Sequence, residues 1–291
     1  MNSTALSIVT CSYGPDAARC IRLCESIDRY VPASIEHVLI VPRRDAEAFR
    51  SLASNRRRLL FTEDILPGTY RQLPLFDRWW LDSRGWPVRG WIMQQVTKLS
   101  VDAAVASDNI MFADSDVQFI RPLDPNALMK DGKLRLHRIP GAANSGRHLS
   151  WHHRAAHLLG LEAGYLGSDY IGQLITWRRE HLIGLHEALQ NHHGRPWHEL
   201  VARSTHFSEY ILYGAYVEFV VGLQNSDQFG CAEDICHCCW FSEQAEQITD
   251  NSFEISKNAL AILLQSNLKL SNEREKQLLK LAQQHINTGA L

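Results

Sequence analysis

The stretch Ile110-Met111-Phe112-Ala113-Asp114-Ser115-Asp116 decides the fold expected for this chain. A continuous run of four apolar residues is typical of a strand that is covered on both faces, as strands of parallel sheets are. Two carboxylates follow at once, separated by one small residue. In open α/β sheets, ligands bind at the carboxyl ends of the strands. The stretch therefore predicts an α/β fold with a ligand site at Asp114 and Asp116.

The residues before this strand alternate strand-sized apolar runs with amphipathic stretches. The runs at 6–11, 37–41 and 59–62 predict three further strands. The stretches at 17–27 and 91–106 carry apolar residues at helical spacing. Strands that alternate with helices favour a mostly parallel, Rossmann-like sheet flanked by helices on both faces.

The last part of the chain has a different pattern. A polar stretch around 249–252 is followed by a region, roughly 255–286, that has helical character and is interrupted by the cap-type residues Ser271 and Asn272. We therefore predict an α/β domain over residues 1–245 and a C-terminal helical segment, a pair of helices, over residues 246–291.

Composition limits the classes of function. The chain has 291 residues, and 30 Lys and Arg against 32 Asp and Glu leave a net charge of −2, which argues against a dedicated nucleic-acid binder. The longest apolar runs are strand-sized, so no transmembrane segment is predicted. The first residues lack the basic region of a signal peptide. Seven cysteines, several of them clustered, do not resemble a secreted disulfide framework. A cytoplasmic location is expected.

The Asp114-Ser115-Asp116 motif has two interpretations. Carboxylates this close repel each other unless a cation lies between them, and Mg²⁺-type sites use one or two carboxylates together with substrate phosphates. A carboxylate at the end of a strand also caps turns. The motif by itself leaves both interpretations open.

The surrounding sequence carries a resemblance. The segments GWIMQQVTKL (90–99), FADSDVQF (112–119) and RPL (121–123) resemble the central block of GT-A-type glycosyltransferases. They most resemble a little-characterised bacterial family of predicted glycosyltransferases. The resemblance covers roughly residues 5–240 and is sharpest over 90–122 and around 207–216.

This resemblance implies a GT-A-like catalytic domain that binds a nucleotide diphosphate sugar and transfers its sugar to an unknown acceptor, a glycan or a small molecule. In such enzymes the strand-ending Asp-x-Asp holds Mn²⁺ or Mg²⁺ against the donor diphosphate. The resemblance thus implies Asp114 and Asp116 as metal ligands, with Ser115 beside the donor.

Further donor contacts are implied residue by residue. Ser12 and Tyr13 end the first strand, where GT-A folds pass under the nucleotide, and Tyr13 would stack on the base. Asp64 follows the third strand, where an acidic residue often contacts the base, although an acidic helix cap has the same pattern. Lys98 would contact the donor phosphates or sugar. From the sequence alone, Lys98 is a solvated residue on the polar face of a helix.

His237 is a candidate third metal ligand, because in many GT-A enzymes a histidine near the end of the domain completes the metal shell. A zinc site is the alternative, since His237 lies among clustered cysteines: Cys231, Cys236, Cys238 and Cys239. Zinc ligands usually come as two separated pairs, and these thiols crowd one segment. The cysteines are therefore expected to fill small apolar gaps.

Two carboxylates are candidates for the acceptor side. Glu209 opens a predicted helix, at a point comparable to where GT-A enzymes place an acidic or amide residue near the anomeric carbon. A helix also gains about 0.3–1 kcal/mol from an acidic residue in its first turn, so Glu209 has a purely structural explanation too. Asp169 is the weaker candidate.

Two other classes of protein remain open. A strand ending in Asp-x-Asp also begins phosphatases of the haloacid dehalogenase type, in which the first Asp is the nucleophile. Their motif continues with Thr or Val where this chain has Gln118, and it closes the first strand rather than about the fourth. A catalytically inactive module that binds nucleotide sugars is the other alternative. It would have no need to retain Glu209 and His237 beside the Asp-x-Asp.

Overall fold

The computed structural model describes residues 5–68, 70–74, 76, 78–250 and 252–288. Within these residues, the central sheet has five strands in the order β13-β7-β1-β2-β3. Strands β1, β2, β3 and β7 are parallel, and β13 is antiparallel to β7. They span Leu6–Cys11 (β1), Glu36–Val41 (β2), Arg57–Phe61 (β3), Asn109–Phe112 (β7) and Ile175–Arg178 (β13). The predicted α/β fold with a mostly parallel sheet is confirmed.

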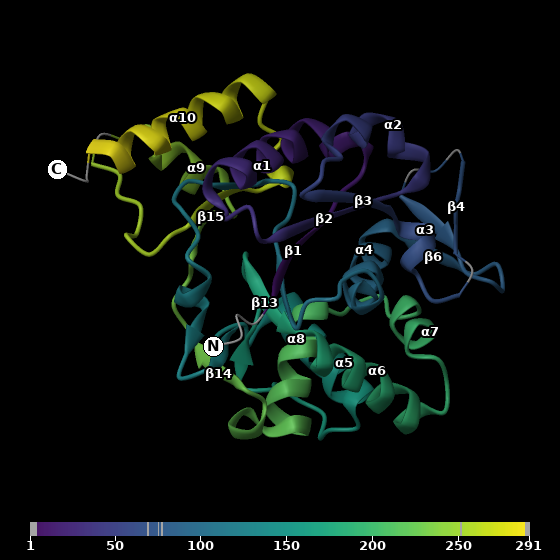
Figure 1. The fold of residues 1–291 in the computed structure, drawn as a ribbon. Coiled ribbons are helices and arrows are strands. Elements are labelled where there is room, and N and C mark those ends of the chain that lie inside the picture. Colours follow the sequence, from purple (N-terminus) through teal and green to yellow (C-terminus); the bar gives the residue numbers. More distant parts are fainter. Residues whose placement is uncertain (1–4, 69, 75, 77, 251, 289–291) are drawn as a thin grey trace.

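Helices cover both faces of this sheet. Side chains alternate across a sheet, so Ile8 and Met111 pack with Leu23 of α1 on one face, while Val9 and Phe112 face the core on the other. In Figure 1, α1 and α10 lie above the sheet and α5 to α8 lie below it. The longer helices span Ala17–Tyr30 (α1), Gly90–Leu99 (α4), Gly146–Leu159 (α5), Arg179–His193 (α6), Glu209–Ala215 (α8) and Asn272–Thr288 (α10).

Short elements complete the fold. The short helices are Ala46–Phe49 (α2), Thr62–Ile65 (α3), Trp197–Ala202 (α7) and Ser242–Gln247 (α9). One small antiparallel sheet contains Arg71–Gln72 (β4), Trp79–Leu81 (β5) and Pro87–Arg89 (β6). A mixed sheet contains Met129–Lys130 (β9), Lys133–His137 (β10) and Gln228–Cys231 (β14), in which β10 is antiparallel to β9 and parallel to β14. Ile139–Pro140 (β11) and Ser168–Asp169 (β12) form an antiparallel pair.

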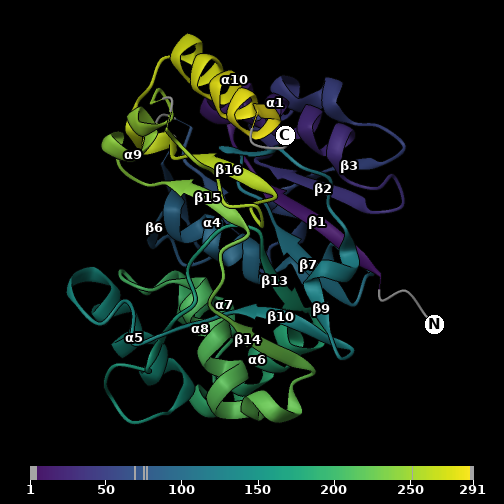
Figure 2. The ribbon, with the colours of Figure 1, turned by 90° about the vertical axis from the view of Figure 1, so that its left-hand side faces the viewer.

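The C-terminal segment differs from the predicted pair of helices. Its last part is α10, but Ala261–Leu264 forms strand β16. This strand pairs with Cys236–Cys239 (β15) and with Val117–Phe119 (β8), which follows the Asp-x-Asp motif. Figure 2 shows β15 and β16 side by side beneath α10. A short, fully buried apolar run does not reveal from periodicity alone whether it is helix or strand, and here the run adds to a sheet.

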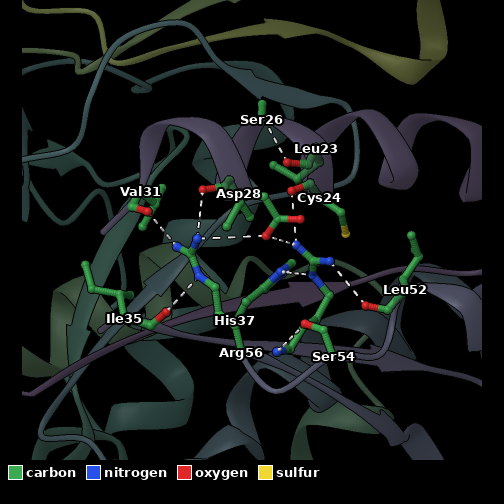
Figure 3. Close-up of polar contacts among 12 residues, drawn as sticks. Leu23, Cys24, Ser26, Asp28, Val31, Ile35, His37, Leu52, Ser54 and Arg56 are labelled. Carbon is green, nitrogen blue, oxygen red and sulfur yellow. Dashed lines mark hydrogen bonds and ion pairs between the residues drawn. The ribbon is translucent and has the colours of Figure 1, made fainter. Parts of the chain in front are cut away.

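A buried arginine on β3 binds residues of α1 and β2, and Figure 3 shows its partners Cys24, Asp28 and His37. Arg57, on β3, is almost fully buried. Its guanidinium donates to the carboxylate of Asp28 (2.8 Å), the carbonyl of Cys24 (3.0 Å) and Nδ1 of His37 (2.8 Å). Buried charges in proteins are normally paired and hydrogen-bonded in this way.

The same arginine orders a hydrogen-bonded chain across the sheet. A guanidinium only donates, so Nδ1 of His37 must accept and the neutral ring carries its proton on Nε2. That Nε2 lies 3.0 Å from Oγ1 of Thr10, and the Thr10 hydroxyl donates to the carbonyl of Ala113 at 2.8 Å. This series of hydrogen bonds therefore links β3, β2 and β1 to Ala113, the residue immediately before Asp114.

Replacing His37 by Gln is expected to make the protein less sensitive to acid. Burial, reinforced by Arg57 and Arg56, holds the pKa of His37 well below its ordinary value. As the pH falls below about 6.5, the unfolded chain binds a proton that the folded protein does not. Stability then decreases by about 1.4 kcal/mol per pH unit until the folded-state pKa is reached. Glutamine can accept from Arg57 and donate to Thr10, but it does not titrate.

Urea unfolding of the two proteins at neutral pH and at about pH 5 checks this. We expect similar stability at neutral pH and a smaller acid loss in His37→Gln, by about one proton's contribution. The exposed His153, replaced by Gln, is the matched control. An unchanged slope in His37→Gln would show that the ring is protonated in the folded state.

No helix in the described ranges has both the length and the apolar character needed to cross a membrane.

Candidate active site

Lys98, near the end of α4, is the centre of a buried charged cluster. Its side chain is not solvated as the helical pattern alone predicts, because the residue is only 4% exposed. Its Nζ lies 2.9 Å from Oδ1 of Asp114 and 3.3 Å from Oε1 of Glu209, and it donates to the hydroxyl of Tyr210 at 2.9 Å. One ammonium thus joins two carboxylates that are far apart in the sequence.

The fold explains why these residues meet. Asp114 follows β7, and the carboxyl ends of β7 and the parallel strand β1 lie side by side. Helix α4 packs on the face of the sheet that contains Phe112. Helix α8 begins with Glu209, whose backbone N–H donates to Oε1 of Gln95 on α4 at 3.0 Å. The cluster therefore lies at the sheet edge where α/β proteins bind ligands.

The charges in the cluster depend on one another. Burial by itself lowers the pKa of Lys98, but the attraction of Asp114, Tyr210 and Glu209 outweighs burial and the net pKa is raised well above its usual value. Burial raises the pKa of Glu209, and Lys98 opposes this. Burial also raises the pKa of Tyr210 well above its usual value, so its hydroxyl stays neutral. With both carboxylates ionised, the cluster has one more negative charge than positive charge.

Gln173 is a member of this site that sequence reasoning missed. Its Nε2 donates to Oδ2 of Asp114 at 3.2 Å, while its buried Oε1 has no hydrogen-bond partner among the described residues. The next residue, Leu174, has a φ of 54°, a left-handed conformation that is uncommon for a bulky residue. The loop before β13 has no periodic pattern that would single out Gln173. For Gln95 a signal exists, because it lies three residues before Lys98 on the same face of α4.

Ser12 and Ser115 also meet at this edge. The Ser115 hydroxyl donates to Oγ of Ser12 at 2.8 Å, which ties the turn after β1 to the Asp-x-Asp motif. Tyr13 follows with a partly exposed ring. The next turn brings Gly14 against Asp45, whose Oδ2 accepts the Gly14 N–H at 2.9 Å. A Cβ on Gly14 would lie only 3.0 Å from Oδ1 of Asp45, so this close approach favours glycine.

Asp116 is held by the C-terminal segment. Its Oδ2 accepts the backbone N–H of Ser266 at 2.9 Å, and its carbonyl accepts the N–H of Leu264 at 3.2 Å. Burial and the nearby charge of Asp114 raise the pKa of Asp116 to about 7. The charge of Asp114 thus acts on the Asp116 carboxylate, and a cation between the two stays a prediction.

Asp64 and Asp169 have local contacts outside the cluster. Asp64, at the exposed end of α3, forms an ion pair with Arg43. Asp169 lies on β12, and its Oδ1 accepts the N–H of Ile171 at 3.0 Å, which is a turn contact. The structure therefore does not place either carboxylate in direct contact with Lys98.

His237 is also not gathered with the two aspartates. It lies on β15 opposite Ile262, and its ring packs edge-on against Phe253 at 5.1 Å between centroids. The neighbouring thiols are free, and two of them, Cys236 and Cys239, are buried. Within the described part of the chain, no group of three or more His, Cys, Asp or Glu side chains could hold a metal ion. The alternative zinc site therefore has no such ligand group among the described residues.

A smaller donor set still fits a hard cation. Mg²⁺-type sites take oxygen ligands and often use only one or two carboxylates, with water and substrate phosphates completing the shell. Asp114 and Asp116 supply two neighbouring carboxylates. Gln173 contacts Asp114 through Nε2, and its buried Oε1 has no hydrogen-bond partner among the described residues. The residues that fit Mn²⁺ or Mg²⁺ are therefore Asp114 and Asp116, with Gln173 in contact with Asp114, and His237 as a third ligand stays a prediction.

Known proteins were compared with the chain by fold and by sequence. An active-site mutant of LgtC has 10% sequence identity and a TM-score of 0.48, with 95% of each chain covered. The galactosyltransferase LgtC in complex with donor and acceptor sugar analogs has 11% identity and a TM-score of 0.46 over 95% of each chain. Mouse xyloside xylosyltransferase 1 has 11% identity and a TM-score of 0.44 over 92% of this chain and 100% of that chain.

In sequence, no curated protein matches the chain. One family model matches residues 3–288, which is nearly the whole chain. The chain belongs to the family of unknown function DUF6492.

Proposed function

We propose that this protein is a glycosyltransferase that moves a sugar from a nucleotide diphosphate sugar to an acceptor, a glycan or a small molecule. The observation that carries the proposal is the buried Lys98, which holds Asp114 and Glu209 together at the carboxyl edge of a parallel sheet. These residues fall in the two segments, 90–122 and 207–216, where the sequence most resembles GT-A glycosyltransferases. The geometry and the motif thus support the same reaction.

The donor would bind across the ends of β1 and β7. Asp114 and Asp116 would hold Mn²⁺ or Mg²⁺, which when bound supplies positive charge against the leaving diphosphate. Ser12 and Ser115, already hydrogen-bonded to each other, would line the diphosphate, and the Tyr13 ring would stack on the base. In this proposal the ion pair of Asp64 with Arg43 lies at the outer rim of the base site.

Glu209 would act on the acceptor side. Burial raises its pKa, as suits a group that takes up a proton from an acceptor hydroxyl. If the reaction retains configuration, the same carboxylate would instead support the anomeric centre. Lys98 would fix the position of Glu209 relative to Asp114, so that donor and acceptor groups are aligned before reaction. Asp169 is the next carboxylate to consider if Glu209 has neither role.

A panel of nucleotide sugars, each with and without Mn²⁺, tests the proposal by thermal unfolding and by product analysis. A donor present at about 100 times its dissociation constant should add about 2.7 kcal/mol to the stability of the protein. Release of free nucleotide together with a glycosylated product supports a transferase. Cleavage of a generic phosphomonoester would instead indicate a haloacid-dehalogenase-type phosphatase, and binding without turnover would indicate an inactive module.

Replacing Asp116 by Asn is expected to lower turnover by at least about 10²-fold, since it removes a metal-binding charge at the leaving group. The fold should remain, because an Asn side chain can still accept the Ser266 N–H. The raised pKa of Asp116 means that its ionisation weakens the folded state as the pH rises through about 7. Asp116→Asn should therefore be at least as stable as the wild type above that pH.

Turnover and urea unfolding, measured above neutral pH, check both expectations. Asp108→Asn is the matched control, because Asp108 is exposed at the other end of β7. Full activity in Asp116→Asn, or in the wild type with excess chelator, would contradict the metal-dependent mechanism.

A further inference from the structure

A small antiparallel sheet, made of β4, β5 and β6, packs beside the central sheet. Its strands β4 and β6 lie at the right-hand edge of the molecule in Figure 1. Trp80 and Val88 are buried on one side of this small sheet and join the main core. Because neighbouring residues of a strand point to opposite sides, Trp79 faces outward. One face of the sheet holds it to the domain, and the other face is open.

Trp79 and Trp86 line one hollow beside this open face, and other large aromatic side chains of residues 76–91 are also exposed. Phe76, Trp79, Trp86 and Trp91 are all exposed, and Trp86 is 62% exposed. Trp86 is presented by an ordered turn, since Oδ1 of Asp82 accepts its backbone N–H at 2.9 Å. Exposed aromatic rings that cluster and are held in place mark an interaction surface.

The exposed charged side chains that the structure describes on this segment are all arginines. Among the described residues of 70–91, the exposed charged side chains are Arg71, Arg78, Arg84 and Arg89. The carboxylate of Asp82 is largely buried and lies 3.6 Å from Arg203. A chain with a net charge of −2 therefore carries a basic, aromatic face, made of these arginines and the rings above, although Arg84 also lies 3.5 Å from the carboxylate of Glu199.

An apolar hollow of about 450 Å³ lies against this face. Its walls come from Trp79, Trp86 and Arg89 on one side and from residues 203–205 on the other. The guanidinium of Arg89 lies 5.9 Å from the centre of the Trp79 ring. Aromatic surface and positive charge are thus interleaved, rather than separated into an apolar patch and a basic patch.

We propose that this basic, aromatic face docks on the surface of an anionic lipid bilayer. Tryptophan rings are favoured at the depth of the lipid headgroups. Arginines beside an anionic membrane gain about 1 kcal/mol each from the surface potential. A neutral saccharide would account for the rings but not for four arginines, and a nucleic acid would account for the arginines but not for the apolar hollow. An anionic bilayer would interact with both the aromatic rings and the arginines.

Sedimentation of the full chain with lipid vesicles tests the proposal. We expect binding to vesicles in which about a third of the phosphatidylcholine is replaced by phosphatidylglycerol, and little binding to phosphatidylcholine alone. Binding should weaken at high salt, because salt screens the surface potential. Replacing Arg71 and Arg89 together by Gln should lower the partition coefficient by about 25-fold, which is about 5-fold for each arginine.

Matched variants distinguish vesicle binding through this face from nonspecific adsorption of the protein. Trp86→Ser should weaken vesicle binding several-fold, whereas Phe241→Ser, at a ring that is 65% exposed on the segment after β15, should not. Arg50→Gln is the charge control, since Arg50 is exposed on another part of the surface. Far-ultraviolet circular dichroism checks that each variant is folded.

Several outcomes would overturn the proposal. They are absence of sedimentation at low salt, wild-type binding by Trp86→Ser, and equal losses in Trp86→Ser and Phe241→Ser. A change of tryptophan fluorescence with a soluble oligosaccharide, without vesicle binding, would assign the rings to sugar recognition instead. None of these measurements uses transfer activity, so they stand apart from the test of the proposed reaction.

Discussion

Replacing Lys98 by Met is expected to lower the free energy of unfolding by about 3–5 kcal/mol, the usual cost of removing one partner of a buried ion pair. Methionine keeps most of the length and apolar stem of the side chain but removes the ammonium that lies 2.9 Å from Asp114 and 3.3 Å from Glu209. The two carboxylates would then face each other without a cation. Turnover should fall by about 10²–10³-fold or more, because the aligned charges of the site are lost.

The pH dependence of this variant has a definite sign. Burial already raises the pKa of Glu209, and loss of Lys98 removes the charge that opposes this rise. A carboxylate with a raised folded-state pKa stabilises the protein at low pH and loses that contribution as the pH rises through the folded-state value. The stability deficit of Lys98→Met relative to the wild type should therefore shrink as the pH is lowered. Urea unfolding across a pH series measures it.

Two comparisons make this prediction specific. Lys130→Met, at an exposed lysine, should change neither stability nor turnover appreciably. A double-mutant cycle with Lys98→Met and Asp114→Asn should give a coupling energy of about 0.5–3 kcal/mol, as residues in contact do. Near-normal stability and turnover in Lys98→Met would show that the ammonium does not link the two carboxylates in solution.

The part of the site that lies on the central strands could be predicted from the sequence. The apolar run before Asp114 indicates a buried strand. Because the carboxyl ends of parallel strands meet at one edge of a sheet, Ser12 and Ser115 are expected to meet at that edge, and they are hydrogen-bonded there. The burial of Lys98 could not be predicted in this way. Helical periodicity identifies the polar face that carries Lys98. It does not show that Tyr210, which is 112 residues later in the sequence, contacts Lys98 on that face.

The secondary structure of the C-terminal residues could not be predicted from the sequence either, because it depends on tertiary contacts. The run Ala261–Leu264 is too short for its period to separate strand from helix, and its pairing with β8 and β15 depends on segments far away in the chain. That pairing sets the position of His237 on β15 and brings Ser266 to Asp116. The predicted helical pair is therefore wrong at this strand, whereas metal binding by His237 stays a prediction.

Replacing Glu209 by Gln is expected to lower turnover by about 10²–10⁴-fold, the usual contribution of a general base. Donor affinity should barely change, because the proposed nucleotide contacts lie around Ser12 and Asp114. Stability should change by less than about 1 kcal/mol, since the Lys98–Asp114 pair remains and the competing buried carboxylate is removed. Calorimetric donor binding, measured beside turnover, checks both expectations.

The purely structural explanation of Glu209 predicts the opposite result. An acidic residue in the first turn of α8 would contribute about 0.3–1 kcal/mol to stability and nothing to turnover. Glu218 provides a control on the same stretch of helix, because its carboxylate forms an ion pair with Arg138 at 2.6 Å. Glu218→Gln should lower stability and leave turnover within a few-fold of the wild type.

The pH profile then identifies what Glu209 does. If Glu209 acts as the base, turnover of the wild type should decrease as the pH falls through its raised pKa, and this limb should be absent from the residual activity of Glu209→Gln. The anomeric configuration of the product, read by proton NMR, separates the two roles. Inversion is expected for a base at the acceptor hydroxyl, and retention for a carboxylate beneath the anomeric centre. Unchanged turnover in Glu209→Gln would move the role to another carboxylate, with Asp169 the next to replace.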